Sequence, residues 1–199
     1  MFETKDSKEL RALIRAAQEG DEQAFEQILT LLEAQVYRLA FSMLRHKQDA
    51  EDATQETFIK LWRTLPSYRF ECPILPYVLK MTRTTVLDMQ RKIERRREHE
   101  LSLTLENDQG ERVELDLADT DVQNDPVAHL SKMELIAQVR QAIEDLPPEH
   151  RDILLLKDMQ GLSYEQIAQT LDIQVGTVAS RLSRARKNLE KILKTRKIF

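Results

Sequence analysis

The helical repeat of apolar residues stops once, in the middle of the chain, and this interruption limits the possible folds more than any other feature. Residues 98–130 carry ten acidic residues and one basic residue, Arg112, and they lack helical periodicity. Repulsion among the acids favours an extended segment, with an isolated hairpin near residues 101–105 as the alternative. On both sides apolar residues recur every three or four positions, as in amphipathic helices. We therefore expect an all-α protein in which an acidic flexible linker, residues 98–130, joins two small helical domains, residues 8–97 and 131–199.

The composition excludes several other classes of protein. Of the 199 residues, 41% are hydrophobic, which suffices for a core and is too much for a disordered chain. The single cysteine, Cys72, allows neither an intrachain disulfide nor a cysteine-cluster zinc site and suits a reducing cytoplasm, so it is either a passive thiol or a redox sensor. No apolar run approaches the ~20 residues that span a bilayer, and the first ten residues do not resemble a secretory signal, so we expect a cytoplasmic protein that is not a membrane protein.

The N-terminal domain is expected to contain four helices. The first ends before Gly20, and Asp21 is expected to cap the second, because a carboxylate accepts hydrogen bonds from the free amides of a helix start. By the same argument we expect Asp49 to cap the third helix, which Pro66 then ends. Leu31 is expected on the apolar stripe of the second helix. In the C-terminal domain we expect Leu135 on the apolar stripe of one helix and Pro148 in the first turn of the next.

A proline-containing loop is expected between the third and fourth helices. Pro73 and Pro76 predict a loop over residues 67–76 and a fourth helix from about Tyr77. Aromatic and basic residues gather here, and this combination suits single-stranded DNA, because bases stack on rings and cations hold phosphates. The candidate residues are Tyr68, Arg69, Phe70, Tyr77, Lys80, Arg83, Arg91 and Lys92.

Two basic stretches stand out against a net charge of −4. Residues 80–97 have a net charge of +5, and residues 174–199 have a net charge of +7. Local charge is what meets a polyanion. From charge alone, nucleic-acid-binding surfaces and solvated helix faces are equally favoured.

Residues 162–189 have the pattern of a helix-turn-helix. Ser163 and Gln166 form a capping box, residues 171–173 form a short turn, and a second helix starts near Val175. The apolar stripe of that helix is Val178, Leu182, Ala185 and Leu189. Its opposite face suits the DNA major groove, with the alternative of a basic helical hairpin that only packs. That face carries Ala179, Ser180, Ser183, Arg184 and Lys187, with Thr177 and Arg181 at its edges.

These residues resemble region 4 of bacterial sigma-70 factors of the extracytoplasmic function (ECF) subfamily. The matching motifs are Asp145-Leu146-Pro147, Arg151 and the run LSYEQIA, LDI, GTV and SRLSRAR within residues 162–186. The resemblance implies binding to the −35 promoter element. It implies base contacts from Ala179, Ser180, Ser183 and Arg184, backbone contacts from Thr177, Arg181 and Arg186, and further contacts from Ser163 and Tyr164.

The N-terminal domain resembles region 2 of the same family. The matching residues are Gly20-Asp21, Ala24-Phe25 and the run from Asp49 to Trp62. The resemblance implies that the helix with this run docks on the β′ clamp helices of core RNA polymerase, whereas the alternative is an ordinary amphipathic helix with Trp62 in the core. The candidate polymerase-binding residues are Asp49, Asp52, Gln55, Glu56, Phe58 and Ile59.

The resemblance also implies that the loop of residues 67–73 captures flipped bases of the −10 element. Tyr77-Val78 and Thr84 stand where most members have Trp-Leu and Asn, so weaker promoter melting or an atypical −10 preference is an alternative. The acidic linker is placed like the family's segment in the RNA-exit path, where it would either mimic RNA or serve as a plain tether.

The expected function is that of an ECF-type sigma factor, which binds core polymerase, recognises the −35 and −10 elements and initiates transcription of a specific regulon. The expected partners are the β′ clamp helices, the β flap, promoter DNA and an anti-sigma factor, anchored in the membrane in many members. We expect no enzymatic activity, cofactor or metal, because no catalytic constellation, nucleotide loop or metal-ligand spacing is present. The alternative is a two-domain helix-turn-helix regulator that never joins polymerase.

Overall fold

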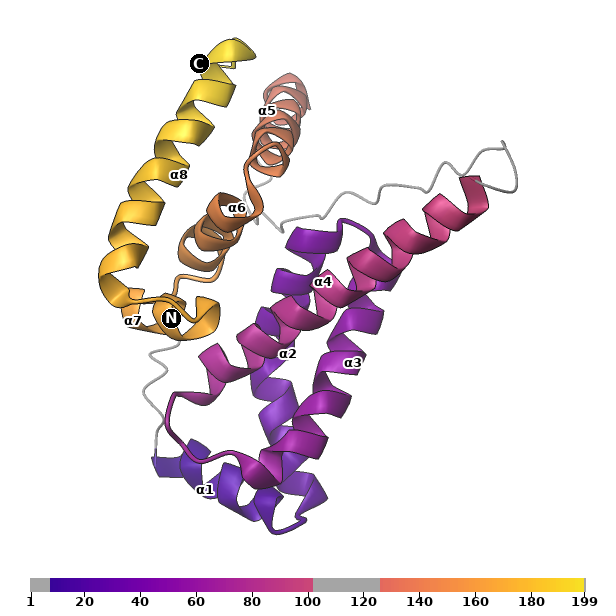
Figure 1. The fold of residues 1–199 in the computed structure, drawn as a ribbon, viewed down its shortest axis with the longest axis vertical. Coiled ribbons are helices and arrows are strands. Elements are labelled where there is room, and N and C mark those ends of the chain that lie inside the picture. Colours follow the sequence, from indigo (N-terminus) through magenta and orange to yellow (C-terminus); the bar gives the residue numbers. More distant parts are fainter. Residues whose placement is uncertain (1–7, 102–125, 199) are drawn as a thin grey trace. The chain divides into compact units, whose positions relative to one another are not determined.

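A computed structural model describes residues 8–101 and 126–198. The chain forms two compact units: α1 to α4 build the N-terminal unit, and α5, α6, η2, α8 and the first half of α7 build the C-terminal unit (Figure 1). The elements are α1 (Lys8–Gln18), α2 (Glu22–Leu44), α3 (Lys47–Thr64), η1 (Leu65–Ser67), α4 (Ile74–Leu101), α5 (Pro126–Glu144), α6 (Pro148–Leu154), the π-helical η2 (Leu155–Met159), α7 (Tyr164–Leu171) and α8 (Val175–Thr195).

The expected all-α fold is confirmed, because the described residues form helices and no strand. Helix α4 continues to Leu101 and α5 already begins at Pro126, so helices extend into both ends of the predicted linker. The rest of that linker, with its alternating segment, lies outside the described residues. None of the helices in the described ranges is long and apolar enough to span a membrane.

The core of the N-terminal unit lies where α2, α3 and α4 meet. Helix α2 packs on both α3 and α4, and α1 packs on α2 and η1. Leu31 was expected to face inward, but it is 39% exposed. The fully buried large side chains of this unit include Ile14, Ile28, Leu39, Leu61, Leu65, Ile74 and Leu79.

Gly20 and Asp21 end α1 and begin α2, as the sequence predicts. Gly20 has a φ of 99°, which an L side chain rarely adopts. The amide of Gly20 donates to Ala17 O and that of Asp21 to Ala16 O, so the end of α1 is closed by a Schellman motif. The Asp21 carboxylate then accepts from the Ala24 amide at 3.0 Å and caps α2.

The expected cap of the third helix was wrong. Helix α3 begins at Lys47, and its N-cap is His46, whose Nδ1 accepts from the Asp49 amide at 3.3 Å. Asp49 therefore lies inside the first turn, where a carboxylate is stabilised by the free amides at the helix start. Histidine is not among the residues that usually cap a helix start, so the sequence did not predict His46 as the cap.

The expected start of the fourth helix was also wrong. Helix α4 begins at Ile74, and Pro76 lies in its first turn. Proline is tolerated in the first turn because its missing N–H would have no partner within the helix. The loop between η1 and α4 is therefore limited to residues 68–73.

The C-terminal unit is organised around the packing of α8 on α6 and α5. Pro148 opens α6, as expected. Arg151 closes the end of α5, because its guanidinium donates to Glu144 O at 2.5 Å and to Leu146 O at 3.3 Å. Leu135, expected on the apolar stripe, is 39% exposed. The buried core of this unit includes Ala142, Leu146, Ile153, Leu155, Leu156, Leu162, Ile167, Val178, Leu182 and Ala185.

Replacing Asp21 with Ala removes the acceptor for the Ala24 amide, and we expect this to destabilise the N-terminal unit by about 1 kcal/mol. Urea unfolding followed by Trp62 fluorescence measures the loss, because Trp62 is the single tryptophan and packs on Phe25 of α2. Asp21→Asn keeps an acceptor and should match the native chain. Equal urea midpoints for Asp21→Ala and the native chain would contradict the expectation.

Candidate functional site

The helix-turn-helix forms as predicted, and hydrogen bonds close both ends of its first helix, α7. The Ser163 amide donates to Gln166 Oε1 at 2.9 Å, and the Gln166 amide donates to Ser163 Oγ at 3.2 Å, which confirms the capping box. At the turn Asp172 has a φ of 57°, and the Ile173 amide donates to Ala168 O at 3.0 Å. Aspartate tolerates this left-handed conformation better than most residues. The turn therefore redirects the chain from α7 into α8 within three residues.

Helix α8 presents a polar face because its apolar stripe is buried. Val178, Leu182 and Ala185 are at most 2% exposed. The residues on the opposite side are exposed, namely Ala179, Ser180, Ser183, Arg184 and Lys187. A helix of 21 residues with small and basic side chains on one exposed face has the shape and chemistry of a major-groove reader.

Arg181 and Arg186 lie on the two flanks of this face, and each is paired with a carboxylate of the same unit. Arg181 Nη2 lies 3.7 Å from Glu149 Oε2, and Arg186 Nη2 donates to Asp158 Oδ1 at 3.1 Å. Glu149, Asp158 and Arg186 are exposed, and Arg181 is partly exposed. Ion pairs at such positions add little stability. An arginine that binds a DNA phosphate would therefore exchange its carboxylate partner for the phosphate.

Lys157 lies beside the start of α7 and was not predicted as part of the site. Lys157 Nζ lies 5.4 Å from the centroid of the Tyr164 ring and donates to Leu162 O at 3.0 Å. Tyr164 is 38% exposed, and Ser163 is exposed beside it. Lys157 lies in η2, outside the helix-turn-helix pattern, so only the tertiary structure brings it to the predicted DNA-binding residues.

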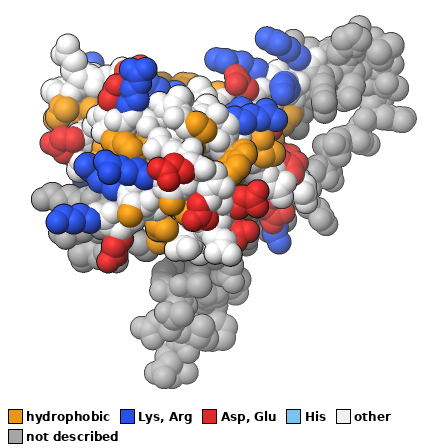
Figure 2. All heavy atoms as spheres, turned by 90° about the horizontal axis from the view of Figure 1, so that it is seen from below, with side chains coloured by type: hydrophobic (Ala, Val, Ile, Leu, Met, Phe, Trp, Pro, Cys, Tyr) orange, Lys and Arg blue, Asp and Glu red, His pale blue; other side chains and the backbone are white. Residues whose placement is uncertain are grey.

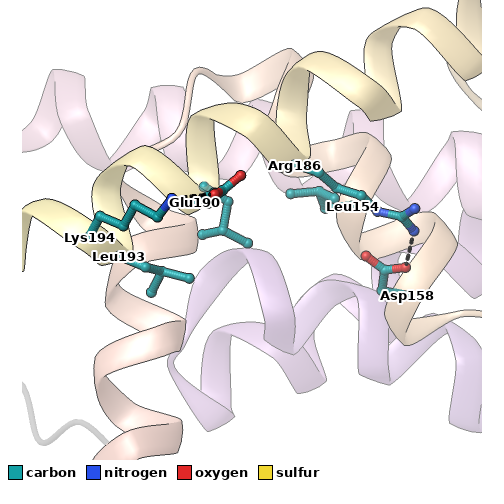
Figure 3. Close-up of a pocket in the computed structure, with 7 residues that line it drawn as sticks. Leu154, Asp158, Arg186, Glu190, Leu193 and Lys194 are labelled. Atoms are coloured by element: carbon teal, nitrogen blue, oxygen red, sulfur yellow. Dashed lines mark hydrogen bonds and ion pairs between the residues drawn. The ribbon is translucent and has the colours of Figure 1, made fainter. Parts of the chain in front are cut away.

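An apolar groove of about 450 Å³ lies between α6 and α8 (Figure 3). Leu154, Leu189 and Leu193 line it. The Arg186–Asp158 pair lies at one end, and the Lys194–Glu190 pair lies further along α8. The groove was not predicted, because its two walls come from segments that are far apart in the sequence.

Helix α3 has a mixed acidic and apolar exposed face. Its buried side contains Ala50, Ala53 and Leu61, together with Thr54 and Thr57, whose hydroxyls donate to backbone carbonyls one turn earlier at 2.7 Å. The predicted polymerase-binding residues lie mostly on the other side: Asp52, Gln55, Glu56 and Ile59 are exposed, and Asp49 and Phe58 are partly exposed.

Trp62 lies at the C-terminal end of this exposed face and is 40% exposed. Its ring meets Phe25 edge-on, with the ring centroids 4.7 Å apart. Ile59, one turn earlier, is 47% exposed. Trp62 is therefore neither a core residue nor a free surface residue, because one edge packs on α2 and the remainder is open to solvent.

Of the three aromatic residues expected at the site around the loop of residues 68–73, Phe70 and Tyr77 are partly exposed and Tyr68 is buried. Tyr68 is 7% exposed, and its hydroxyl donates to Cys72 O at 2.5 Å. Its ring packs on Phe70 and Tyr77, with centroids 4.9 and 5.1 Å away. Tyr68 therefore supports the loop from inside, and its ring is less accessible than those of Phe70 and Tyr77. Phe70 and Tyr77 are only partly buried.

Phe70 holds a strained backbone conformation at the exposed tip of this loop. Its φ is 59°, and left-handed backbone in a residue other than glycine costs about 1–3 kcal/mol. Strain of this kind is concentrated in ligand-binding loops. Phe70 is thus the aromatic residue of the loop with the strongest structural case for contact with a ligand.

Of the basic residues predicted for the same site, Arg69 lies in the loop and the others lie along α4. Arg69, Lys80, Arg91 and Lys92 are exposed, and Arg83 is partly exposed. Arg91 Nη1 pairs with Asp88 Oδ1 at 3.3 Å. On the face shown in Figure 2, basic, acidic and hydrophobic side chains are interspersed.

Comparison with known proteins identifies the family. Residues 29–97 match the family model for sigma-70 region 2, and residues 136–189 match that for sigma-70 region 4. The RNA polymerase sigma-H factor of Pseudomonas aeruginosa is 32% identical over 181 residues, which cover 91% of this chain and 92% of the relative. The chain belongs to the ECF subfamily of sigma-70 factors. It is therefore a transcription initiation factor and not an enzyme.

Other relatives of this sigma factor agree with the assignment. The ECF sigma factor SigE of Mycolicibacterium smegmatis is 37% identical over 161 residues, which cover 79% of this chain and 57% of that protein. The chain thus spans little more than half the length of that relative. The crystallised sigma factor RpoE of Bartonella quintana, in complex with the anti-sigma factor NepR, matches with a TM-score of 0.60 at 25% identity over 85% of this chain and 96% of that one.

Ser163→Ala tests the structure at the start of α7. The pKa of Glu165 is lowered by hydrogen bonds from its own backbone amide and from Ser163. The resulting stabilisation is present above the ordinary carboxylate pKa and is lost as the pH falls through the lowered value. We expect Ser163→Ala to raise this pKa towards its ordinary value in an NMR titration. The control Gln169→Ala, on an exposed position of α7, should not change it, and an unchanged pKa in Ser163→Ala would refute the hydrogen bond from Ser163 to Glu165.

Proposed function

We propose that this sigma factor confers promoter specificity by binding core polymerase and contacting both the −35 and −10 elements. Residues 8–97 would bind core polymerase and the −10 element, and residues 131–199 would bind the −35 element. One observation supports this proposal most directly. The same chain has an exposed polar face on α8, which suits DNA, and an exposed face on α3 that is both acidic and apolar, which suits a protein partner. The regulon would consist of the promoters that satisfy both contacts.

The proposed −35 contact uses the exposed face of α8. Arg184 can donate two hydrogen bonds to guanine, and Ser180 and Ser183 are tolerant hydrogen-bonding partners. Thr177, Arg181 and Arg186 would bind phosphates, together with Ser163 and Tyr164 at the start of α7. Phosphate contacts provide affinity and position the helix, and base contacts provide specificity.

The proposed polymerase contact uses the exposed face of α3 against the β′ clamp helices. Asp49, Asp52 and Glu56 would speed encounter with a basic partner surface, and Phe58 and Ile59 would anchor it. The alternative of a helix-turn-helix regulator that acts without polymerase does not fit a member of the sigma-70 family. The 47% exposure of Ile59 amid acidic residues favours the sigma-factor function, because a regulator of that kind needs no such protein-docking face.

The groove between α6 and α8 is our candidate for the β flap contact. Leucine side chains line it. The lining residues that α8 contributes lie on the flank of that helix with Arg186, not on the face with Ser180 and Arg184. A polymerase element could therefore occupy the groove while the reading face binds DNA. An amphipathic element with apolar residues towards Leu154 and Leu193 would suit it.

We also propose an anti-sigma factor as a partner. Support comes from the Bartonella quintana sigma factor RpoE, whose structure was determined with the anti-sigma factor NepR. Membrane anchoring of such a partner follows from the family resemblance alone. The sigma factor itself would work in the cytoplasm, where RNA polymerase acts.

Run-off transcription tests the proposal as a whole. Native sigma factor and purified core polymerase are incubated with a library of genomic fragments, and the transcribed promoters are sequenced. We expect a limited set of start sites that share two conserved elements. Identical start sites with and without the protein would exclude the function.

The double variant Asp52→Ala/Gln55→Ala should bind core polymerase about tenfold more weakly, which corresponds to about 1.4 kcal/mol. Both side chains are exposed, so the fold should remain intact. A pull-down with purified core measures retention. The matched control Glu26→Ala/Gln27→Ala also removes one carboxylate and one amide side chain, from an exposed part of α2, and should be retained like the native chain. Equal retention of both variants would argue against the α3 interface.

Arg184→Ala should cost about 1–3 kcal/mol at one base pair of the −35 element and relax the preference there. Arg186→Ala, by contrast, should weaken binding to all sequences alike and lower the salt dependence of log K by about 0.9. Holoenzyme affinity for single-base variants of a promoter selected above distinguishes the two patterns. An unchanged profile for Arg184→Ala would remove Arg184 from the site.

A further inference from the structure

Two arginines of α1 lie against the loop that the −10 proposal depends on. The Cζ atoms of Arg11 and Arg15 are each 5.9 Å from the centroid of the Phe70 ring. Residues four positions apart share one helix face, so both guanidinium groups approach the ring from the same element. Both arginines are exposed. Neither lies within residues 29–97, which match the region 2 family model.

The loop is attached to α1 by hydrogen bonds as well as by this ring contact. Gln18 Nε2 donates to Leu65 O at 2.9 Å and to Tyr68 O at 2.8 Å. Ile14 and Ala17 bury the other side of α1, and α1 packs on η1 just before the loop (Figure 1). The position of the two arginines relative to Phe70 is therefore set by the fold of the N-terminal unit.

The charge around Phe70 suits a phosphate backbone. Arg11, Arg15 and Arg69 against Glu71 give these four residues a net charge of +2. A guanidinium that stacks on a ring uses its face, and its N–H edge suits phosphate oxygens. Stacking on a ring and binding of adjacent phosphates are the two contacts by which proteins hold single strands.

We propose that Arg11 and Arg15 bind phosphates of single-stranded DNA next to the base held at Phe70, so that α1 completes the −10 site. The inference rests on the proposed function, because it requires the loop to bind the melted −10 strand. Gln18 and Tyr68 already hold the loop backbone. The loop backbone is therefore held by bonds that do not involve the arginines, and we assign the N–H edges of the two guanidinium groups to the ligand.

The test uses holoenzyme assembled from the full chain and core polymerase. Its probe is a labelled single strand with the non-template −10 sequence of a promoter selected by run-off transcription, and binding is measured over a range of KCl concentrations. For Arg11→Gln/Arg15→Gln we expect about tenfold weaker binding and a salt slope of log K smaller by about 1.4, because each single-strand phosphate contact contributes about 0.7. Arg11→Lys/Arg15→Lys should retain most of the slope, since lysine also binds phosphate. The control Arg38→Gln, an exposed arginine of α2, should match the native chain.

The other outcomes overturn the inference. An unchanged salt slope with unchanged affinity shows that the arginines do not contact the strand. Weaker binding with an unchanged slope shows that they only position Phe70. If run-off transcription selects no promoter, the proposed function itself fails and the inference fails with it, whereas normal promoter selection with an unaffected Gln variant refutes the inference alone.

Discussion

Each exposed functional face in this sigma factor depends on a buried stripe on the opposite side of the same helix. In α8 the burial of Val178, Leu182 and Ala185 directs Ser180, Ser183 and Arg184 outward. The same constraint acts on α3, where Ala50, Ala53 and Leu61 are buried while Asp52, Gln55 and Ile59 are exposed. Because an α-helix repeats every 3.6 residues, burial of one stripe determines what the other side presents.

The ends of the helices then determine where these faces lie. Arg151 closes α5, Ser163 and Gln166 open α7, and Asp172 turns the chain into α8. In the N-terminal unit, Gln18 ties α1 to the start of the 68–73 loop. Hydrogen bonds at helix ends therefore connect the rigid core of each unit to the segments proposed to meet a partner.

Much of the fold could be predicted from local patterns. The start of α2 at Asp21, the capping box of α7 and the opening of α6 at Pro148 all depend on neighbouring residues, and all were predicted correctly. The errors arose where a local rule allows an exception. His46 replaced Asp49 as a cap, and the first turn of α4 accommodated Pro76.

The amino-acid sequence alone determined the helical class, the helix-turn-helix and the family, because periodicity, capping and motif spacing are properties of neighbouring residues. Only the tertiary structure decided that Tyr68 supports its loop from inside, that Arg11 and Arg15 lie against Phe70, and that a groove separates Leu154 from Leu193. The first of these features depends on how the loop folds back on itself, and the last two join residues far apart in the chain. Their contact depends on how the helices pack, which a local pattern does not encode.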